Sequence, residues 1–300
     1  MAWDRPQRAA GIDIAELGHG LIVRQAEPPR VHQLNNTASK VLELCDGRHT
    51  VYEIAAALAE AFTLDAPPLA QAAACVTELR QAGVLANRAG HPFDFFAAVF
   101  CLNLDHQPVR WENAVRRFMT LKIAARVERF SAVSTPHNHH VGCASSWRLM
   151  VAEARDRGLR NFLGIEDDAI FLDTTLDVVS AALSELEGLD WDLLYLGGAA
   201  WQRLAAVPGC LALRRARSLT CTHALAVNHT AYDRLLADIP PTASIDEWIG
   251  EHTAIDQYLS RRVDAGSYRA YVLHPRVATQ AELTAPGGLD GPLRNRYTIR

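Results

Sequence analysis

The stretch NFLGIEDDAIFLD, residues 161–173, decides how the larger part of this chain is expected to fold. Its apolar half, NFLGI, predicts a buried strand, and three acids, Glu166, Asp167 and Asp168, follow directly. Open α/β sheets bind their ligands at the carboxyl ends of their strands. The sequence therefore predicts a ligand site where this strand ends.

The segments around this stretch alternate between apolar strands and amphipathic helices. Expected strands are FFAAVFCLNL (95–104), ARVERFSAV (125–133), WDLLYLGG (191–198) and THALAVN (222–228), and expected helices cover 108–121, 142–157 and about 175–187. This alternation predicts an α/β fold with a mostly parallel sheet and helices on both faces.

A smaller domain is expected before that sheet. GLIVRQ (20–25) and RVHQL (30–34) predict a hairpin, and three helices should follow. The first is expected to be capped by Asn36 or Thr37, the second by a Thr50–Glu53 capping box, and the third, 69–82, to end at Gly83. The polar segment 87–94 places the boundary, giving domains 1–88 and 95–300.

Composition narrows the function classes. With 300 residues, 30 basic and 34 acidic side chains and a net charge of -4, the chain offers no field to attract nucleic acid or an anionic membrane surface. No apolar run is long enough to span a bilayer, and the N-terminus lacks a signal-peptide core. Six cysteines without a C-x-x-C pair favour the cytoplasm. We expect a complete soluble protein whose partners are small ligands or other proteins.

The N-terminal features resemble the PqqD-like family over about residues 15–86. The resemblance lies in the hairpin, in LNNTASKVLELCDGRHTVYEIAAALAEAF and in a closing helix that ends ELRQAGVL. It implies a small winged-helix domain that holds the leader of a precursor peptide by adding a strand to a sheet edge. The implied leader-binding residues are Arg30, Val31, His32 and Leu34 on the edge, and Val76 and Leu79 on the groove wall.

Two other roles stay open for this domain. Winged helices also bind DNA, but between Thr50 and Leu85 the chain has four acids and one cation, Arg80, whereas phosphate contact demands clustered bases. The domain could also dimerise or brace its neighbour, since edge strands pair with one another.

The larger part resembles glycosyltransferase family 25 over about residues 97–280. Its landmarks, in order, are VFCLNLDHQPVR, VGCASSWRLMVAEA, FLGIEDDAIF, WDLLYLGG, THALAVNHTAYDRLL, AIDQYL and LHPRVATQ. The resemblance implies a GT-A-like, Rossmann-type fold, a UDP-sugar donor, a Mn²⁺ or Mg²⁺ cofactor and inversion at the anomeric carbon.

The acidic triplet suits a divalent cation. Along an extended chain Glu166 and Asp168 point the same way, so they can share one metal, and Asp167 is left to hydrogen-bond the nucleotide or the backbone. His274 could be a third metal ligand or contact a diphosphate, although a single histidine in such a run is often structural. The acids could also simply cap a following helix.

Other side chains are candidates for binding the nucleotide sugar. Asn103 can contact a uracil or ribose edge and Arg110 the base or a phosphate. Arg110 could also belong, with Arg116 and Arg117, to a solvated helix face, which is the interpretation favoured for the latter two. Further along, HHVGCASSW offers Gly142 and Ser145 where a loop turns into a helix. Family members usually carry histidine where Trp147 stands here, so the acceptor surface could differ.

Inversion requires a base that takes the proton of the acceptor hydroxyl. Asp256 in AIDQYL is the first candidate and Asp246 in SIDEW its rival, although Asp256 could merely cap a helix. The function expected is hexose transfer from a UDP-sugar to a hydroxyl side chain of a leader-bound precursor peptide. The alternatives are an inactive peptide-binding scaffold and a transferase acting on a lipopolysaccharide glycan.

Overall fold

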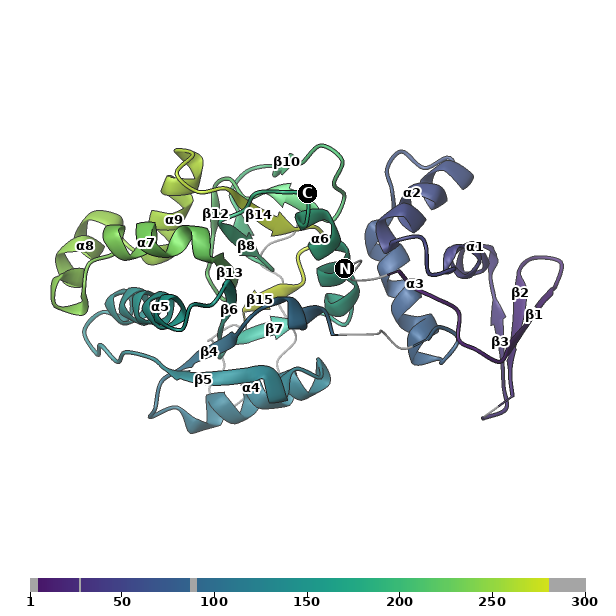
Figure 1. The fold of residues 1–300 in the computed structure, drawn as a ribbon, viewed down its shortest axis with the longest axis horizontal. Coiled ribbons are helices and arrows are strands. Elements are labelled where there is room, and N and C mark those ends of the chain that lie inside the picture. The colour runs from purple at the N-terminus through teal and green to yellow at the C-terminus, as the bar shows by residue number, and fades with distance from the viewer. Residues whose placement is uncertain (1–4, 27, 87–90, 281–300) are drawn as a thin grey trace. The chain divides into compact units, whose positions relative to one another are not determined.

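The computed structural model describes residues 5–26, 28–86 and 91–280 and divides into two compact units (Figure 1). The first unit comprises Met1–Asp94, Asp173–Leu189 and Pro208–Leu213, and the second comprises Phe95–Leu172, Asp190–Val207 and Arg214–Arg300. The sequence placed the division between 88 and 95, and two later segments of the chain also join the first unit.

The first unit opens with an antiparallel sheet of three strands in the order β1-β2-β3, namely β1 (Ile12–Glu16), β2 (Leu21–Gln25) and β3 (Arg30–Leu34). The two predicted strands are present, but the expected hairpin is part of a larger sheet. β1 was missed because its alternation is limited to Ile12, Asp13 and Ile14, and four of its five residues are exposed. β3 is an edge strand of this sheet.

Three helices follow, α1 (Asn36–Leu44), α2 (Val51–Ala61) and α3 (Leu69–Gln81). The cap of α1 is Asn35, one residue before the predicted position, and its side chain accepts the N–H of Ala38 at 2.9 Å. The Thr50–Glu53 capping box is confirmed. Beyond α3 the chain turns at Gly83, whose φ of 76° suits a residue without a Cβ. The helices bury a common apolar core that includes Val41, Leu42, Ile54, Leu58, Ala73, Val76 and Leu79.

Helix α6 (Thr175–Leu186) belongs to this first unit although it lies far along the chain. Its Asp177 is buried and forms an ion pair with Arg80 of α3 at 2.6 Å. The hydroxyl of Thr77 donates to the same carboxylate. A buried pair of this kind loses much of its stability when one partner is removed. Residues that the sequence assigned to two domains therefore form one packed unit.

The second unit is built on an eight-stranded sheet in the order β10-β11-β14-β8-β13-β6-β4-β5. β5, β4 and β6 run parallel, as do β8 and β14, and β13 runs antiparallel to β6 and β8 between them. Five strands thus share one direction, which confirms the predicted mostly parallel α/β class. The strands are β4 (Val99–Asn103), β5 (Val127–Ser131), β6 (Asn161–Glu166), β8 (Leu193–Tyr195), β10 (Ala205–Ala206), β11 (Leu213–Arg215), β13 (Ala224–Asn228) and β14 (Ala270–Leu273).

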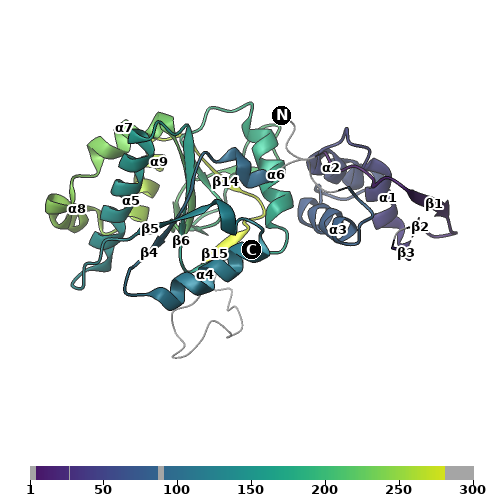
Figure 2. The same cartoon turned by 60° about the horizontal axis from the view of Figure 1, so that its bottom comes forward.

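Helices flank this sheet. Figure 2 shows α5, α7, α8 and α9 gathered on one side of it, where their apolar residues share a buried cluster with Phe100 and Leu102 of β4. Cys101, between those two residues, instead lies near Arg117 of α4 because neighbouring residues in a strand face opposite ways. The helices are α4 (Pro108–Thr120), α5 (His139–Asp156), α7 (His229–Asp238), α8 (Ile245–His252) and α9 (Ile255–Asp264).

Two small antiparallel sheets complete the second unit. One pairs β9 (Ala199–Ala200) with β12 (Leu219–Thr220), and the other pairs β7 (Ala169–Phe171) with β15 (Ala278–Gln280). The second pair lies directly after the acidic triplet and brings the chain near residue 280 beside it.

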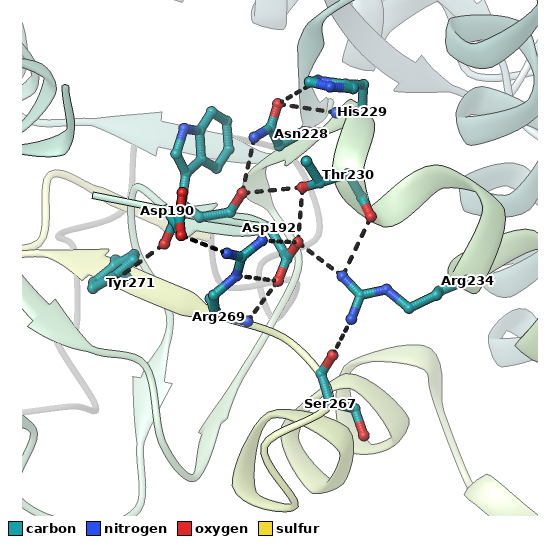
Figure 3. Close-up of polar contacts among 10 residues, drawn as sticks. Asp190, Asp192, Asn228, His229, Thr230, Arg234, Ser267, Arg269 and Tyr271 are labelled. Atoms are coloured by element: carbon teal, nitrogen blue, oxygen red, sulfur yellow. Dashed lines mark hydrogen bonds and ion pairs between the residues drawn. The ribbon is translucent and has the colours of Figure 1, made fainter. Parts of the chain in front are cut away.

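Asp192, just before β8, is the centre of a buried polar cluster (Figure 3). Its side chain is 1% exposed and accepts hydrogen bonds from Arg234 at 2.8 Å, from the backbone N–H of Arg269 at 2.8 Å and from Thr230 at 2.7 Å. Burial alone would raise the pKa of Asp192, but these bonds outweigh it and the pKa is lowered. The cluster ties β8, α7 and β14 together.

Candidate active site

The acidic triplet forms a turn at the carboxyl end of β6. β6 ends at Glu166, Asp167 and Asp168 form the turn, and β7 begins at Ala169. The chain is therefore extended only as far as Glu166. The predicted emergence of the carboxylates at the end of a buried strand is confirmed.

Glu166 is held by neutral donors alone. Thr222 donates its hydroxyl to Oε1 at 2.7 Å, and Gln280 donates its amide to Oε2 at 3.2 Å. Burial, and next the negative charge of Asp168, raise the pKa of Glu166 to about 7. The indole N–H of Trp147 is close enough to offset part of this rise, although it completes no hydrogen bond within the described residues. The two carboxylates of Glu166 and Asp168 therefore lie close together.

Asp167 is turned into the protein. Its carboxylate accepts the amide of Asn103 at 2.7 Å and forms an ion pair with Arg110, and its carbonyl accepts a hydrogen bond from Arg117. Arg117 is thus half-buried against the triplet, and its interpretation as a solvated side chain was wrong. Arg116 is exposed as expected. The helical periodicity of the sequence predicted that both arginines lie on one helix. It could not show which of them packs toward the sheet.

Asp168 has one charged partner, Arg110, and one carboxylate oxygen without a partner among the described residues. Arg110 approaches its Oδ2 at 3.3 Å, and its buried Oδ1 has no hydrogen-bond partner among the described residues. Burial raises the pKa of this carboxyl, and Arg110 only partly compensates. A buried oxygen without a donor is costly, and a bound cation would relieve that cost.

Asp256 lies in the first turn of α9. Its Oδ2 accepts the backbone N–H of Cys221 at 3.0 Å, and its Oδ1 accepts that of Gln257 at 2.8 Å. After burial and Asp168, the charge of Asp256 is a further cause of the raised pKa of Glu166, so the two are within electrostatic range. Asp246 is exposed in the first turn of α8 and is not among the causes of the raised pKa of Glu166 or of Asp168.

Most of the residues predicted to bind the nucleotide sugar have structural partners. Both amide hydrogens of Asn103 are used, by Asp167 and by the carbonyl of Gln107, and its oxygen accepts Arg129. Gly142 lies in α5, and a side chain there would collide with the carbonyl of Val133. Glycine is therefore required where the segment around Val133 packs against α5. The buried hydroxyl of Ser145 has no partner among the described residues.

His274 follows β14 and lies among cations rather than carboxylates. Its burial, and next the charges of Arg214 and Arg276, lower its pKa. The structure therefore does not bring His274 together with Glu166 and Asp168. Within the described ranges there is no group of three or more His, Cys, Asp or Glu side chains that could hold a metal ion.

Thr222 was not anticipated as a site residue. It precedes β13, and because β13 runs antiparallel to β6, the start of β13 meets the end of β6. The predicted mostly parallel sheet did not indicate that β13 runs in the opposite direction. The only sequence signal was a threonine at the head of an apolar run.

The predicted leader-binding residues divide into two groups. Val31 on edge strand β3 is 69% exposed, Arg30 is also exposed, and His32 and Leu34 are half-buried. Val76 and Leu79 are instead buried in the core of the first unit, so their assignment to a groove wall is corrected. Their apolar spacing marks the inner face of α3, which helical periodicity cannot distinguish from a binding face.

Comparison with known proteins agrees with the N-terminal prediction. Residues 21–85 match the family described as coenzyme PQQ synthesis protein D (PqqD), which confirms the PqqD-like part. No curated protein matches the chain. No helix in the described ranges is both long and apolar enough to cross a membrane.

Several solved structures show distant similarity. One is a glycosyltransferase involved in the glycosylation of the major capsid of PBCV-1, with 9% identity, a TM-score of 0.33 and coverage of 59% of this chain and 91% of that one. A197 from STIV has 10% identity and a TM-score of 0.35, covering 59% and 81%. Mannose-1-phosphate geranyltransferase from Thermus thermophilus has 16% identity and a TM-score of 0.26, covering 58% of each chain.

Proposed function

We propose that this protein is a glycosyltransferase that uses a divalent metal to move a hexose from a UDP-sugar to a hydroxyl side chain of a precursor peptide. The observation that carries the proposal is the pair of neighbouring carboxylates, Glu166 and Asp168, at the carboxyl end of β6. The protein gives Glu166 only neutral donors and gives Asp168 one ion pair, with Arg110, and the pKa of both carboxyl groups is raised. The family 25 landmarks of the sequence support the same chemistry.

The donor set fits Mn²⁺ or Mg²⁺. Both are hard cations that take carboxylate oxygens and keep positions for phosphate oxygens and water. Glu166 and Asp168 would hold the ion, and the unpartnered Oδ1 of Asp168 is the oxygen best suited to it. When bound, such an ion neutralises the charge that grows on a departing diphosphate. Cationic neighbours make His274 better suited to phosphate oxygens than to this metal.

Asp256 is the proposed base for the acceptor hydroxyl. The two backbone N–H groups that it accepts fix its carboxylate while leaving lone pairs on both oxygens. Its proximity to Glu166 supports a position beside the proposed metal. Asp246 remains the rival, but it is exposed on α8, and its charge is not among the causes of the raised pKa of Glu166.

The PqqD-like part supplies the proposed acceptor. An extended leader would pair with the free edge of β3, where Val31 offers an exposed apolar side chain. Holding the leader raises the effective concentration of the attached core peptide, so that weak local recognition suffices. This step separates the proposal from a transferase acting on lipopolysaccharide.

The test combines UDP-hexose turnover with mass spectrometry of a precursor peptide coexpressed with the protein. We expect Mn²⁺-stimulated turnover that Asp168→Ala abolishes, and a hexose added to the peptide only when its leader is present. Equal modification of a leaderless peptide would exclude the tether. Deleting the first 86 residues is a poor test, because it would also expose the buried face of α6.

An inactive peptide-binding scaffold is the second candidate function. The observation in its favour is Trp147, which stands where family members usually carry histidine and packs its ring against Gly164 in β6. A scaffold predicts leader binding without any donor turnover, whatever metal is supplied.

A further inference from the structure

A basic cluster follows the carboxyl end of β14. It consists of Arg214 from β11, the neighbouring strand, and of His274 and Arg276 beyond β14. The pKa of His274 is lowered by burial and then by the charges of both arginines, so each arginine lies within electrostatic range of His274. No acid contributes to that shift.

Arg276 has no acidic partner among the described residues. It is half-buried, and its guanidinium donates to the carbonyl of Gly198, a neutral acceptor. No carboxylate of the described ranges lies within ion-pair distance of it. A partly buried cation without a counter-charge is unfavourable, and a bound anion would remove that cost.

The basic cluster lies at the same edge of the sheet as the acidic turn. Cys221 connects the two, because its thiol is within electrostatic range of Arg276 and also of Asp256 and Glu166. Arg276 also comes two residues before β15, which pairs with β7 directly after the acidic turn. Anionic and cationic groups therefore meet on one ligand-binding edge.

Arg110, the arginine that the sequence assigned to phosphate, is already neutralised. It forms ion pairs with Asp167 and Asp168, whereas Arg276 has none within the described ranges. Guanidinium groups bind phosphate oxygens through paired, charge-assisted hydrogen bonds, so the cation without a counter-charge is the better candidate.

We propose that Arg276, with Arg214 and His274 beside it, forms a phosphate-binding site that takes the diphosphate of the donor. The identity of the ligand as a sugar nucleotide rests on the proposed function, but the existence of an anion site does not. Arg276 is expected to act on the diphosphate opposite the two carboxylates Glu166 and Asp168.

The test measures binding of inorganic pyrophosphate to the full-length protein by calorimetry, without metal, and binding of UDP with Mn²⁺. Losing a charge-assisted contact should weaken pyrophosphate binding to Arg276→Gln about 10- to 100-fold. Arg276→Lys should retain part of the affinity. Arg217→Gln, the same change at an exposed position of the second unit, should bind like wild type.

The outcomes separate this inference from the proposed function. Unchanged pyrophosphate affinity in a folded Arg276→Gln variant, or no pyrophosphate binding by wild type, would overturn the phosphate site even if hexose transfer is observed. Arg276-dependent pyrophosphate binding without UDP binding or hexose transfer would instead uphold the anion site and reject the glycosyltransferase. Melting temperatures within about 2 °C of wild type confirm that the variants are folded.

Discussion

Replacing Asp192 by asparagine should destabilise the second unit strongly. Asparagine keeps the shape of the side chain but loses its charge, and turns an N–H₂ group toward donors that the carboxylate accepted. Arg269 donates to this carboxylate from its backbone N–H at 2.8 Å and from Nε at 3.1 Å, and Arg234 donates from Nη2 at 2.8 Å. In the variant, the buried side-chain N–H₂ group therefore faces N–H donors of Arg234 and Arg269.

The magnitude follows from burial. Breaking a buried ion pair costs about 3–5 kcal/mol, and because both arginines are nearly half exposed and can be rehydrated, we expect the lower end, about 3 kcal/mol. At about 2–4 °C per kcal/mol for a unit of this size, the melting temperature should fall by about 6–12 °C. Thermal denaturation followed by circular dichroism or calorimetry measures this.

Asp190→Asn is the matched control. Asp190 also pairs with Arg269, at 3.0 Å, but its side chain is 87% exposed, so its loss should cost at most about 1 kcal/mol. Since the pKa of Asp192 is lowered, its contribution is complete at neutral pH and is lost as the pH falls through that lowered pKa. Equal shifts in both variants, or a shift under about 2 °C for Asp192→Asn at neutral pH, would refute the reasoning.

Three further predictions concern the candidate site and the first unit. Glu166→Gln should raise the melting temperature by a few degrees at about pH 8, equivalent to about 1–3 kcal/mol, but not at about pH 5. The reason is that the raised pKa makes the native glutamate increasingly unfavourable as the pH rises toward 7. The exposed change Glu112→Gln should show no such pH dependence, and a pH-independent effect of Glu166→Gln would contradict the burial argument. Asp256→Asn should lower kcat about 100-fold or more while UDP binding is retained, as expected for loss of a base; an effect on binding alone would assign Asp256 a structural role. Val31→Asp should weaken leader binding about tenfold in fluorescence anisotropy without changing the melting temperature, and intact leader binding would exclude β3 as the docking edge.

Much of the fold was predictable because it depends on local patterns. The capping box at Thr50, the strand that ends at Glu166 and the alternation of strands and helices all follow from nearby residues. β1 was not predictable because its alternation covers only three residues, too few to mark a strand. The place of α6 was not predictable either, since its partners Thr77 and Arg80 are about 100 residues distant in the chain.

The candidate site was predictable in its acids but not in their surroundings. A charged triplet after an apolar strand is visible in the sequence, whereas the burial that distinguishes Arg117 from Arg116 requires the sheet to be in place. The antiparallel direction of β13 depends on long-range pairing that residue patterns do not encode. Thr222 and Arg276 could therefore be recognised as site residues only from the structure.

The antiparallel direction of β13 determines which loops meet at the carboxyl end of β6 and how their lengths can change in evolution. In a wholly parallel sheet, a strand brings to this edge only the residues that come after it. β13 brings the residues that come before it, so the loop carrying Thr222 meets the turn carrying Glu166 although more than 50 positions separate them in the chain. Insertions could lengthen either loop without altering the other. The two loops that meet at Glu166 are therefore free to change length separately.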